Sequence, residues 1–288
     1  MVNTRSVFVT GTSTGIGRSI AVDLAAAGLQ VFGSVRSTAD GQALVQATPI
    51  GALALIPVMM DVRDVDSVRA AAAQVNALLP DGALWGLVNN AGISVAAPLE
   101  YIPLDAFETQ LDVNLTGVLR CVQAFLPLLK PSRGRIVNIS SMSGRVAFPT
   151  IGAYSTSKFA LEGFSDALRL ELKVHGMDVC VIQPGSIATP IWERSRARAA
   201  ELMKAIPAQG KQEYRKMISQ ALETTQANGA DAAAPQLCAD AVRHALTAKR
   251  PRTRYVVGKD ARQILFLRRW LLSDRMLDWL TLRSLGLQ

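Results

Sequence analysis

The sequence has 288 residues and a formal net charge of +8, and this length suits one large domain with a well-buried core. Hydrophobic residues make up 49% of the chain and charged residues 19%, a balance that excludes an intrinsically disordered protein. The positive charge would suit nucleic acid, anionic lipid or a polyphosphate cofactor, and charge alone does not choose among them.

Cysteine and histidine usage argues against cross-links and metal sites. The three cysteines, Cys121, Cys180 and Cys238, stand far apart, which supports neither a disulfide framework nor a zinc site and favours a reducing, cytoplasmic compartment. The only histidines, His175 and His244, have no carboxylate cluster beside them, so we expect no metal. No uninterrupted apolar run approaches the ~20 residues that span a bilayer.

Short apolar runs rich in β-branched residues alternate with helix-length segments along the chain. The expected strands are residues 7–10, 31–35, 53–59, 84–89, 135–140, 179–183 and 254–257. Helices are expected at residues 16–27, closed by Gly28, and 65–79, closed by Pro80 and Gly82. Strands that are apolar nearly throughout predict an α/β fold with a doubly wound, Rossmann-type parallel sheet, whose ligands bind beyond the carboxyl ends of the strands.

Two later segments depart from this alternation within what we expect to be a single domain over residues 1–288. The stretch from Ile191 to about Asn228 is polar and favours helix, which predicts a helical substrate lid at about 190–230 or, alternatively, a plain surface helical hairpin. The tail at about 262–288 reads as two amphipathic helices, with Ser273 capping the second. It could pack on the body or a twin subunit, line the substrate mouth, or make peripheral membrane contact.

A glycine-rich turn follows the first expected strand and leads directly into a helix. Glycines at such a turn let the backbone approach a pyrophosphate, which then lies at the positive end of the helix. The predicted cofactor-binding residues of this turn are Gly11, Ser13, Thr14, Gly15, Ile16 and Gly17.

The same stretch also fits the G-x-S-x-G nucleophile elbow of hydrolases, which would be a different class of function. A hydrolase needs an oxyanion-hole loop and supporting strands earlier in the chain, and only nine residues precede Thr10. We therefore favour the dinucleotide interpretation.

The end of the second strand bears on the choice of cofactor. An acidic residue there binds the ribose hydroxyls of NAD, whereas an arginine accommodates the 2′-phosphate of NADP. The chain has Arg36 and no acid at this point, so NADP is favoured and NAD is the less favoured alternative. Arg18 or Ser37 would assist Arg36.

Several further motifs follow in order. They are Asn89-Asn90-Ala91-Gly92, Asn114, Ser140-Ser141, the Tyr154 to Lys158 segment, Pro184-Gly185 and Thr189. In order and spacing this set resembles the short-chain dehydrogenase/reductase family over roughly residues 5–260. The resemblance implies an oxidoreductase that moves a hydride between nicotinamide and a carbonyl or hydroxyl carbon.

Tyr154 and Lys158 lie four apart in a segment that reads as helical, so their side chains share one face. A tyrosine with a pKa of ~10 is a poor acid or base at neutral pH, and lowering that pKa by ~3 units takes roughly 4 kcal/mol of phenolate stabilisation. We expect the lysine ammonium and an oxidised nicotinamide to supply it.

The resemblance also implies roles for individual residues. Ser141 would hydrogen-bond the substrate oxygen, Tyr154 would exchange its proton, Lys158 would tune the tyrosine and hold the nicotinamide ribose, and Asn114 would complete a proton relay. The further implied cofactor contacts are Asp61, Val62, Asn89, Ala91, Gly92, Pro184, Gly185, Ile187 and Thr189.

The substrate is inferred from apolar residues expected at the mouth of the site. They are Val95, Ala96, Val146, Phe148, Pro149, Ile151, Ile191 and Trp192. The Ser157 to Gly163 run, together with the long lid and the basic, aromatic tail, resembles the branch of the family that handles steroids, retinoids and other lipids. The apolar mouth and this resemblance predict a small lipophilic alcohol or ketone as substrate.

Rival functions remain open on the sequence alone. A 3-ketoacyl carrier reductase could use the basic lid residues Arg196 and Arg198, and a cofactor-sensing regulator or membrane-peripheral scaffold would belong to another class. Nucleic-acid binding is not expected. By resemblance, the protein forms homo-oligomers through helices at residues 104–126 and 153–175.

Overall fold

The computed structural model describes residues 5–79, 82–230, 232–284 and 286–287. Its centre is a seven-stranded sheet in the order β3-β2-β1-β4-β5-β6-β7, and every strand pair is parallel. The strands are β1 Ser6–Val9, β2 Gln30–Val35, β3 Ile56–Met59, β4 Gly86–Asn89, β5 Arg135–Ile139, β6 Asp178–Pro184 and β7 Arg254–Val257. This confirms the doubly wound α/β prediction.

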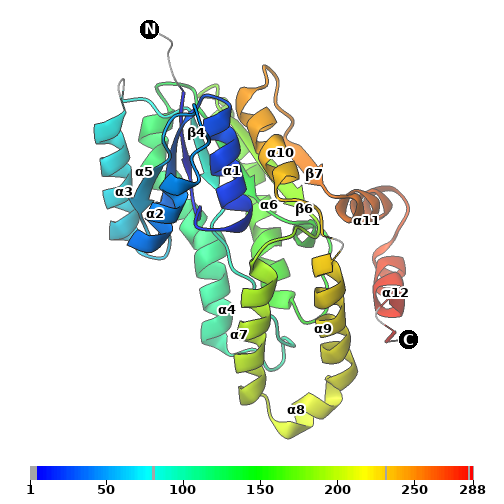
Figure 1. The fold of residues 1–288 in the computed structure, drawn as a ribbon. Coiled ribbons are helices and arrows are strands. Elements are labelled where there is room, and N and C mark those ends of the chain that lie inside the picture. Colours follow the sequence, from blue (N-terminus) through cyan, green and yellow to red (C-terminus); the bar gives the residue numbers. More distant parts are fainter. Residues whose placement is uncertain (1–4, 80–81, 231, 285, 288) are drawn as a thin grey trace.

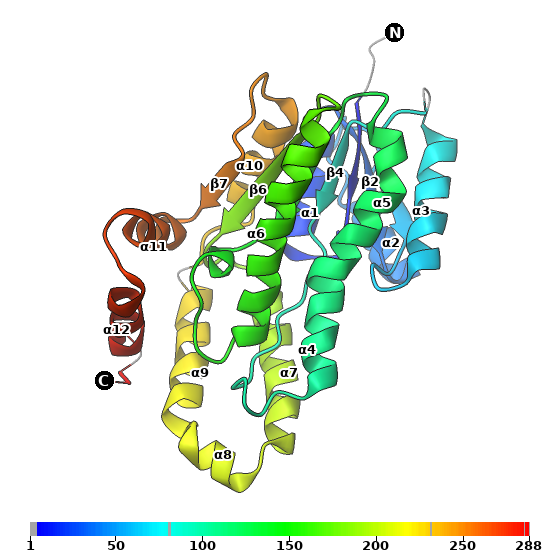
Figure 2. The ribbon, with the colours of Figure 1, turned by 180° about the vertical axis from the view of Figure 1, so that it is seen from behind.

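Helices cover both faces of the sheet (Figures 1 and 2). One face packs against α1 (Gly15–Ala26) and α10 (Gln236–Thr247), with α2 (Thr38–Gln46) at the edge. The other face packs against α3 (Val65–Leu78), α5 (Gly117–Leu129) and α6 (Gly152–Lys173). Side chains of β1 alternate between the two faces of the sheet. Val7 and Val9 pack in the core of the first face, and Phe8 packs in the core of the second. The rings of Phe8 and Phe125 stack with their centres 4.2 Å apart.

The expected fourth strand, 84–89, starts at Gly86, and two other predicted elements differ more from the observed ones. The third strand starts at Ile56 rather than Leu53, because Ile56 is the first residue that pairs with β2, through Phe32. The helix expected over residues 104–126 is α4 (Leu104–Leu111) and α5 joined by a π-helical turn, η1 (Asp112–Thr116). That turn contains Asn114, one of the expected catalytic residues.

Three helices occupy residues 191–230, below the carboxyl edge of the sheet (Figures 1 and 2). They are α7 (Ile191–Ala205), α8 (Ala208–Glu213) and α9 (Arg215–Ala230), and we call them the lid segment. An isolated parallel bridge between Ile187 and Ala233 closes its base.

The C-terminal tail projects from β7 at the side of the molecule (Figure 1). It forms α11 (Lys259–Trp270) and α12 (Asp274–Ser284). The Ser273 hydroxyl accepts a hydrogen bond from the Met276 amide at 3.4 Å, as expected for a helix-capping residue. Among the described residues, no helix is long and apolar enough to cross a membrane.

Candidate active site

A cavity of about 560 Å³ lies between the carboxyl edge of the sheet and the lid segment. Its lining joins the expected dinucleotide turn, the expected catalytic residues and helices α7 and α9. Of the predicted site residues, only Asn89 and Asn114 do not line it. The structure therefore gathers predicted residues from Gly11 to Thr189 into one site, as expected at the ligand edge of a doubly wound sheet.

The backbone of the glycine turn is conformationally special and closely packed on its neighbours. Gly11 and Gly15 have φ values of 70° and 60°, in the left-handed region that other residues rarely adopt. A Cβ atom on Gly17 would lie 2.2 Å from the Gly11 carbonyl oxygen. A Cβ atom on Gly15 would lie 3.2 Å from Thr189, so the residues just before the lid segment pack directly on the turn. The turn needs glycine at these positions.

Thr10 fixes the loop after β4 against the glycine turn. Its hydroxyl accepts hydrogen bonds from the amides of Asn90 and Ala91, both at 2.9 Å. The Asn90 side chain in turn donates to the carbonyls of Thr10 and Gly11 at 2.9 and 3.1 Å. Ala91 and Gly92 thus reach the cavity at fixed positions.

Asn89 does not reach the cavity. It is 3% exposed and points into the sheet, where its amide donates to Asn138 at 2.9 Å. Successive strand residues point to opposite sides, so the adjacent Asn90, which sequence reasoning did not choose, takes the position at the cavity wall.

Charged residues gather where the adenosine end of a dinucleotide is expected. Arg36 and Asp61 both line the cavity, and Asp61 forms an ion pair with Arg63 at 2.9 Å. Hydrogen bonding to Arg63 holds the pKa of the Asp61 carboxyl below its usual range. Arg18 and Ser37 are engaged elsewhere, because Arg18 donates to the Ala43 carbonyl and Ser37 caps α2.

Tyr154, Lys158 and Ser141 face one another across the cavity wall. Tyr154 and Lys158 lie one turn apart on α6, and the Lys158 ammonium lies 5.7 Å from the centre of the tyrosine ring. That ammonium donates to the Ile139 carbonyl at the end of β5 at 2.8 Å. Ser141 begins the short 3-10 turn η2 (Met142–Gly144) and accepts a hydrogen bond from the Ser143 amide at 3.1 Å.

Burial dominates the electrostatics of this pair. It raises the pKa of Tyr154, and a hydrogen bond with Ser141 offsets part of that rise. Burial also lowers the pKa of Lys158 to about 8, while the Glu162 carboxylate acts in the opposite direction. The protein's own groups therefore raise the pKa of Tyr154, contrary to the lowering expected from Lys158.

Asn114 lies behind the cavity wall and supports it through hydrogen bonds. Its carbonyl accepts from the Ile93 amide at 2.9 Å, and its amide donates to the Ile93 carbonyl at 3.0 Å and to Ser157 at 3.1 Å. Ser157 donates to the Tyr154 carbonyl at 2.7 Å. Asn114 is thereby linked to the backbone of Tyr154, and the π-helical turn places it there.

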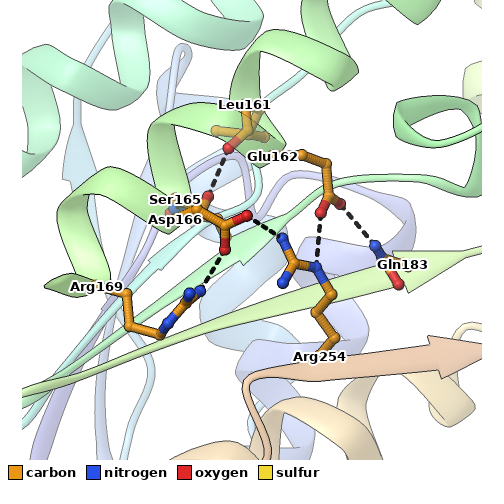
Figure 3. Close-up of polar contacts among 8 residues, drawn as sticks. Leu161, Glu162, Ser165, Asp166, Arg169, Gln183 and Arg254 are labelled. Carbon is orange, nitrogen blue, oxygen red and sulfur yellow. Dashed lines mark hydrogen bonds and ion pairs between the residues drawn. The ribbon is translucent and has the colours of Figure 1, made fainter.

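A buried ionic network supports α6 behind Lys158 (Figure 3). Arg254, on β7, binds Glu162 at 2.9 Å and Asp166 at 2.7 Å. Gln183, on β6, donates to the other oxygen of Glu162 at 2.9 Å. Arg254 thereby holds α6, the helix that carries Tyr154 and Lys158, against the sheet.

Comparison with known proteins agrees with this geometry. The family model for short chain dehydrogenases matches residues 5–200. The chain belongs to the short-chain dehydrogenase family. Members of this family bind nicotinamide cofactors, NAD in some solved structures and NADP in others.

Individual short-chain dehydrogenases match over nearly the whole chain. Bovine 17-beta-hydroxysteroid dehydrogenase type 6 is 36% identical, covering 96% of this chain and 88% of its own. Human retinol dehydrogenase 16 is also 36% identical, with the same two coverages. A short-chain dehydrogenase from Streptomyces avermitilis has a TM-score of 0.78 at 26% identity, covering 99% of this chain and 98% of that one. The expected family and its steroid and retinol branch are confirmed.

Many of the residues that line the cavity are apolar. Six of the eight residues expected at the mouth line it, whereas Val95 and Val146 are buried in the body. The sequence did not single out the lid residues that complete the wall. These are Met203 on α7 and Met217, Ile218, Ala221 and Leu222 on α9.

Proposed function

We propose that the protein is an NADP-dependent oxidoreductase that transfers a hydride between nicotinamide and the carbonyl or hydroxyl carbon of a bulky lipophilic substrate. The observation that carries the proposal is that Tyr154, Lys158 and Ser141 share one cavity with the glycine turn. The bound cofactor would supply the hydride chemistry, and the chain supplies position and proton transfer.

The residues present fit NADP. Gly11, Gly15 and Gly17 line the cavity at the start of α1, and the N-terminus of a helix suits close approach of a pyrophosphate. Arg36 lies at the end of β2 without a carboxylate at the strand end, and an arginine there suits a 2′-phosphate. Ile187 and Thr189 also line the cavity, where they would contact the nicotinamide amide.

Residues of α6 and at the start of η2 would carry out the proton transfer. In the reductive direction Ser141 would donate a hydrogen bond to the substrate oxygen, and Tyr154 would transfer its phenolic proton to that oxygen as it gains charge. Lys158 would hold the nicotinamide ribose and stabilise the resulting phenolate, the role that its position one turn away on the same helix face allows. A positive nicotinamide nearby would supply the lowering of the Tyr154 pKa that burial opposes.

Cavity shape supports a lipophilic substrate. Its far wall combines Phe148 and Trp192 with Met203, Met217 and Leu222 from the lid segment, and unbranched methionine side chains adapt to varied apolar shapes. Relatives at about 36% identity are named for hydroxysteroids and retinol.

The test is oxidation of NADPH and NADH against steroid, retinal, aliphatic and acyl-thioester carbonyls, using wild type, Tyr154→Phe and Arg36→Asp. We expect turnover with NADPH that Tyr154→Phe abolishes and that Arg36→Asp shifts towards NADH. Preference for acyl thioesters would instead favour a 3-ketoacyl carrier reductase. Tight NADPH binding without turnover of any carbonyl would favour a sensing or scaffold protein.

We also propose a homo-oligomer in a reducing, cytoplasmic compartment. Large apolar side chains are exposed on α4, α5 and α6, the helices expected at the interface: Leu104, Leu119, Phe159 and Leu170. Sedimentation of wild type and Leu170→Lys would test this, and a wild-type monomer would refute it.

The tail supports a proposal of peripheral membrane contact. Phe266, Trp270 and Trp279 are exposed, and arginines lie over both tryptophan rings at about 5 Å. Deleting residues 262–288 should abolish binding to anionic vesicles while activity remains. Loss of activity instead would assign the tail to the substrate mouth or the body.

A further inference from the structure

Four arginines surround the adenosine end of the cavity, and they come from both the sheet and the lid segment. Arg36 follows β2 and Arg63 follows β3, whereas Arg194 and Arg198 belong to α7. All four side chains line the same cavity. Two separate parts of the fold therefore direct positive charge to one place.

This charge is largely uncompensated. Among the described residues lining the cavity six are basic and one, Asp61, is acidic. Asp61 is ion-paired with Arg63 at 2.9 Å, and no ion pair within the described part of the chain involves Arg36, Arg194 or Arg198. On the solvent-exposed side of the same helix, by contrast, Lys204 forms an ion pair with Glu201 at 2.9 Å.

The arginines are close enough to repel one another. Burial lowers the pKa of the Arg198 guanidinium, and the positive charges of Arg36, Arg194 and Arg63 lower it further. Like charges held together without a partner cost free energy unless an anion joins them.

The path of α7 explains how a lid residue comes to face the sheet. The segment just before α7 lies on the glycine turn, because a Cβ atom on Gly15 would meet Thr189 at 3.2 Å. Arg194 and Arg198 are four residues apart on this helix, so they share one face about one turn, ~5.4 Å, apart. Arg194, Arg198 and Arg36 line one cavity, so this face of α7 is turned towards the same space as the end of β2.

We propose that Arg198 of the lid segment binds the adenosine 2′-phosphate of the cofactor jointly with Arg36, so that this phosphate holds the lid against the sheet. The proposal rests on the proposed use of NADP and adds a residue that recognises it. A phosphate dianion offers oxygens to two guanidinium forks at once. A ribose hydroxyl would leave both arginines without a counter-charge.

The test compares two probes that differ only in the phosphate, 2′,5′-ADP and 5′-AMP, by calorimetric titration of the full chain. We expect wild type to bind 2′,5′-ADP more tightly. Arg198→Gln and Arg36→Gln should each weaken 2′,5′-ADP binding by roughly tenfold, the worth of a charge-assisted hydrogen bond, and leave 5′-AMP binding unchanged. Lys204→Gln removes a charge from the same helix away from the cavity and should change neither. Arg198 is exposed, so its substitution should not disturb folding.

A second readout reports on the lid itself. In wild type, 2′,5′-ADP should slow amide hydrogen exchange in α7, and 5′-AMP should not. Arg198→Gln should lose this protection.

The outcomes separate this inference from the cofactor proposal. If Arg36→Gln weakens 2′,5′-ADP binding and Arg198→Gln does not, the inference is overturned while NADP preference stands. If wild type binds both probes equally, both proposals fail. If Arg198→Gln changes only the KM of an anionic substrate, the arginine serves the substrate and the inference is likewise overturned.

Discussion

Glu162 lies one helical turn after Lys158 on α6, and its buried carboxylate counteracts the effect of burial on the lysine ammonium. Burial alone favours neutral lysine, and the negative charge nearby favours the charged form. Arg254 keeps that carboxylate in place at 2.9 Å. The network behind the site therefore sets how much of Lys158 is charged near neutral pH.

Glu162→Gln should move the pH dependence of activity. Removing the negative charge lowers the pKa of Lys158 below its value of about 8, so the ammonium, and the activity that depends on it, is lost at a lower pH. The measurement is kcat/KM for carbonyl reduction across pH 6–9. Asp166→Asn is the matched control, because Asp166 also binds Arg254 but does not act on Lys158. An alkaline limb that stays in place in Glu162→Gln would contradict the role assigned to Glu162.

Arg254→Gln should destabilise the fold. The Glu162 side chain is 6% exposed, and leaving a buried carboxylate without its partner costs about 3–5 kcal/mol in comparable cases. We expect a loss of about 2–4 kcal/mol in the free energy of unfolding, since Gln183 still bonds Glu162. Urea denaturation would measure it. The double variant with Glu162→Gln should recover part of the loss, and equal losses in the single and double variants would refute the explanation.

Short local motifs made much of the site predictable from sequence. The glycine turn lies in the single connection between β1 and α1. Tyr154 and Lys158 lie one helical turn apart on α6. In both cases the spacing in the sequence is enough to predict that the residues lie close together. The strand pattern likewise predicted the parallel sheet, since buried strands are apolar throughout.

Contacts between distant segments were not predictable in this way. Arg254 and Glu162 are 92 residues apart, and they meet only because β6 and β7 pair in one particular register. Met217 reaches the cavity because the lid segment turns back at α8, which no local pattern states. The sequence predicted Asn89 as the cofactor contact, whereas the structure places Asn90 at the cavity and buries Asn89 against Asn138.

Lys158→Met should stabilise the protein at neutral pH while abolishing activity. Folding lowers the pKa of Lys158 from 10.5 to about 8, so the unfolded chain binds more protons between these values and wild-type stability rises with pH across that window. Below pH 8 wild type bears the full cost of the buried charge. We expect the variant to gain about 1–3 kcal/mol at pH 7, less whatever the lost bond to Ile139 contributes. Denaturant titration at pH 7 and 10 should show the advantage shrinking as pH rises, and a pH-independent difference would contradict it.

Two reciprocal hydrogen bonds join the tip of the lid segment to the loop before α4. Tyr101 donates to Glu213 at 3.2 Å and Tyr214 donates to Glu100 at 2.9 Å, and the two rings meet edge to face at 5.9 Å. The pKa of Tyr214 is raised chiefly by its hydrogen bond to Glu100, and that of Tyr101 chiefly by desolvation. Both hydroxyls therefore remain protonated and able to donate throughout the neutral range.

Removing both hydroxyls, with Tyr101→Phe/Tyr214→Phe, should loosen the lid without disturbing the catalytic residues. We expect KM for a lipophilic carbonyl to rise roughly two- to fivefold, because two exposed hydrogen bonds contribute modestly, and kcat to change little. Amide hydrogen exchange in α8 should become faster. Glu201→Gln, which breaks a contact on the outer surface of α7, serves as the control and should alter neither quantity. An unchanged KM with faster exchange would show that these two hydrogen bonds order the lid tip without contributing to substrate binding.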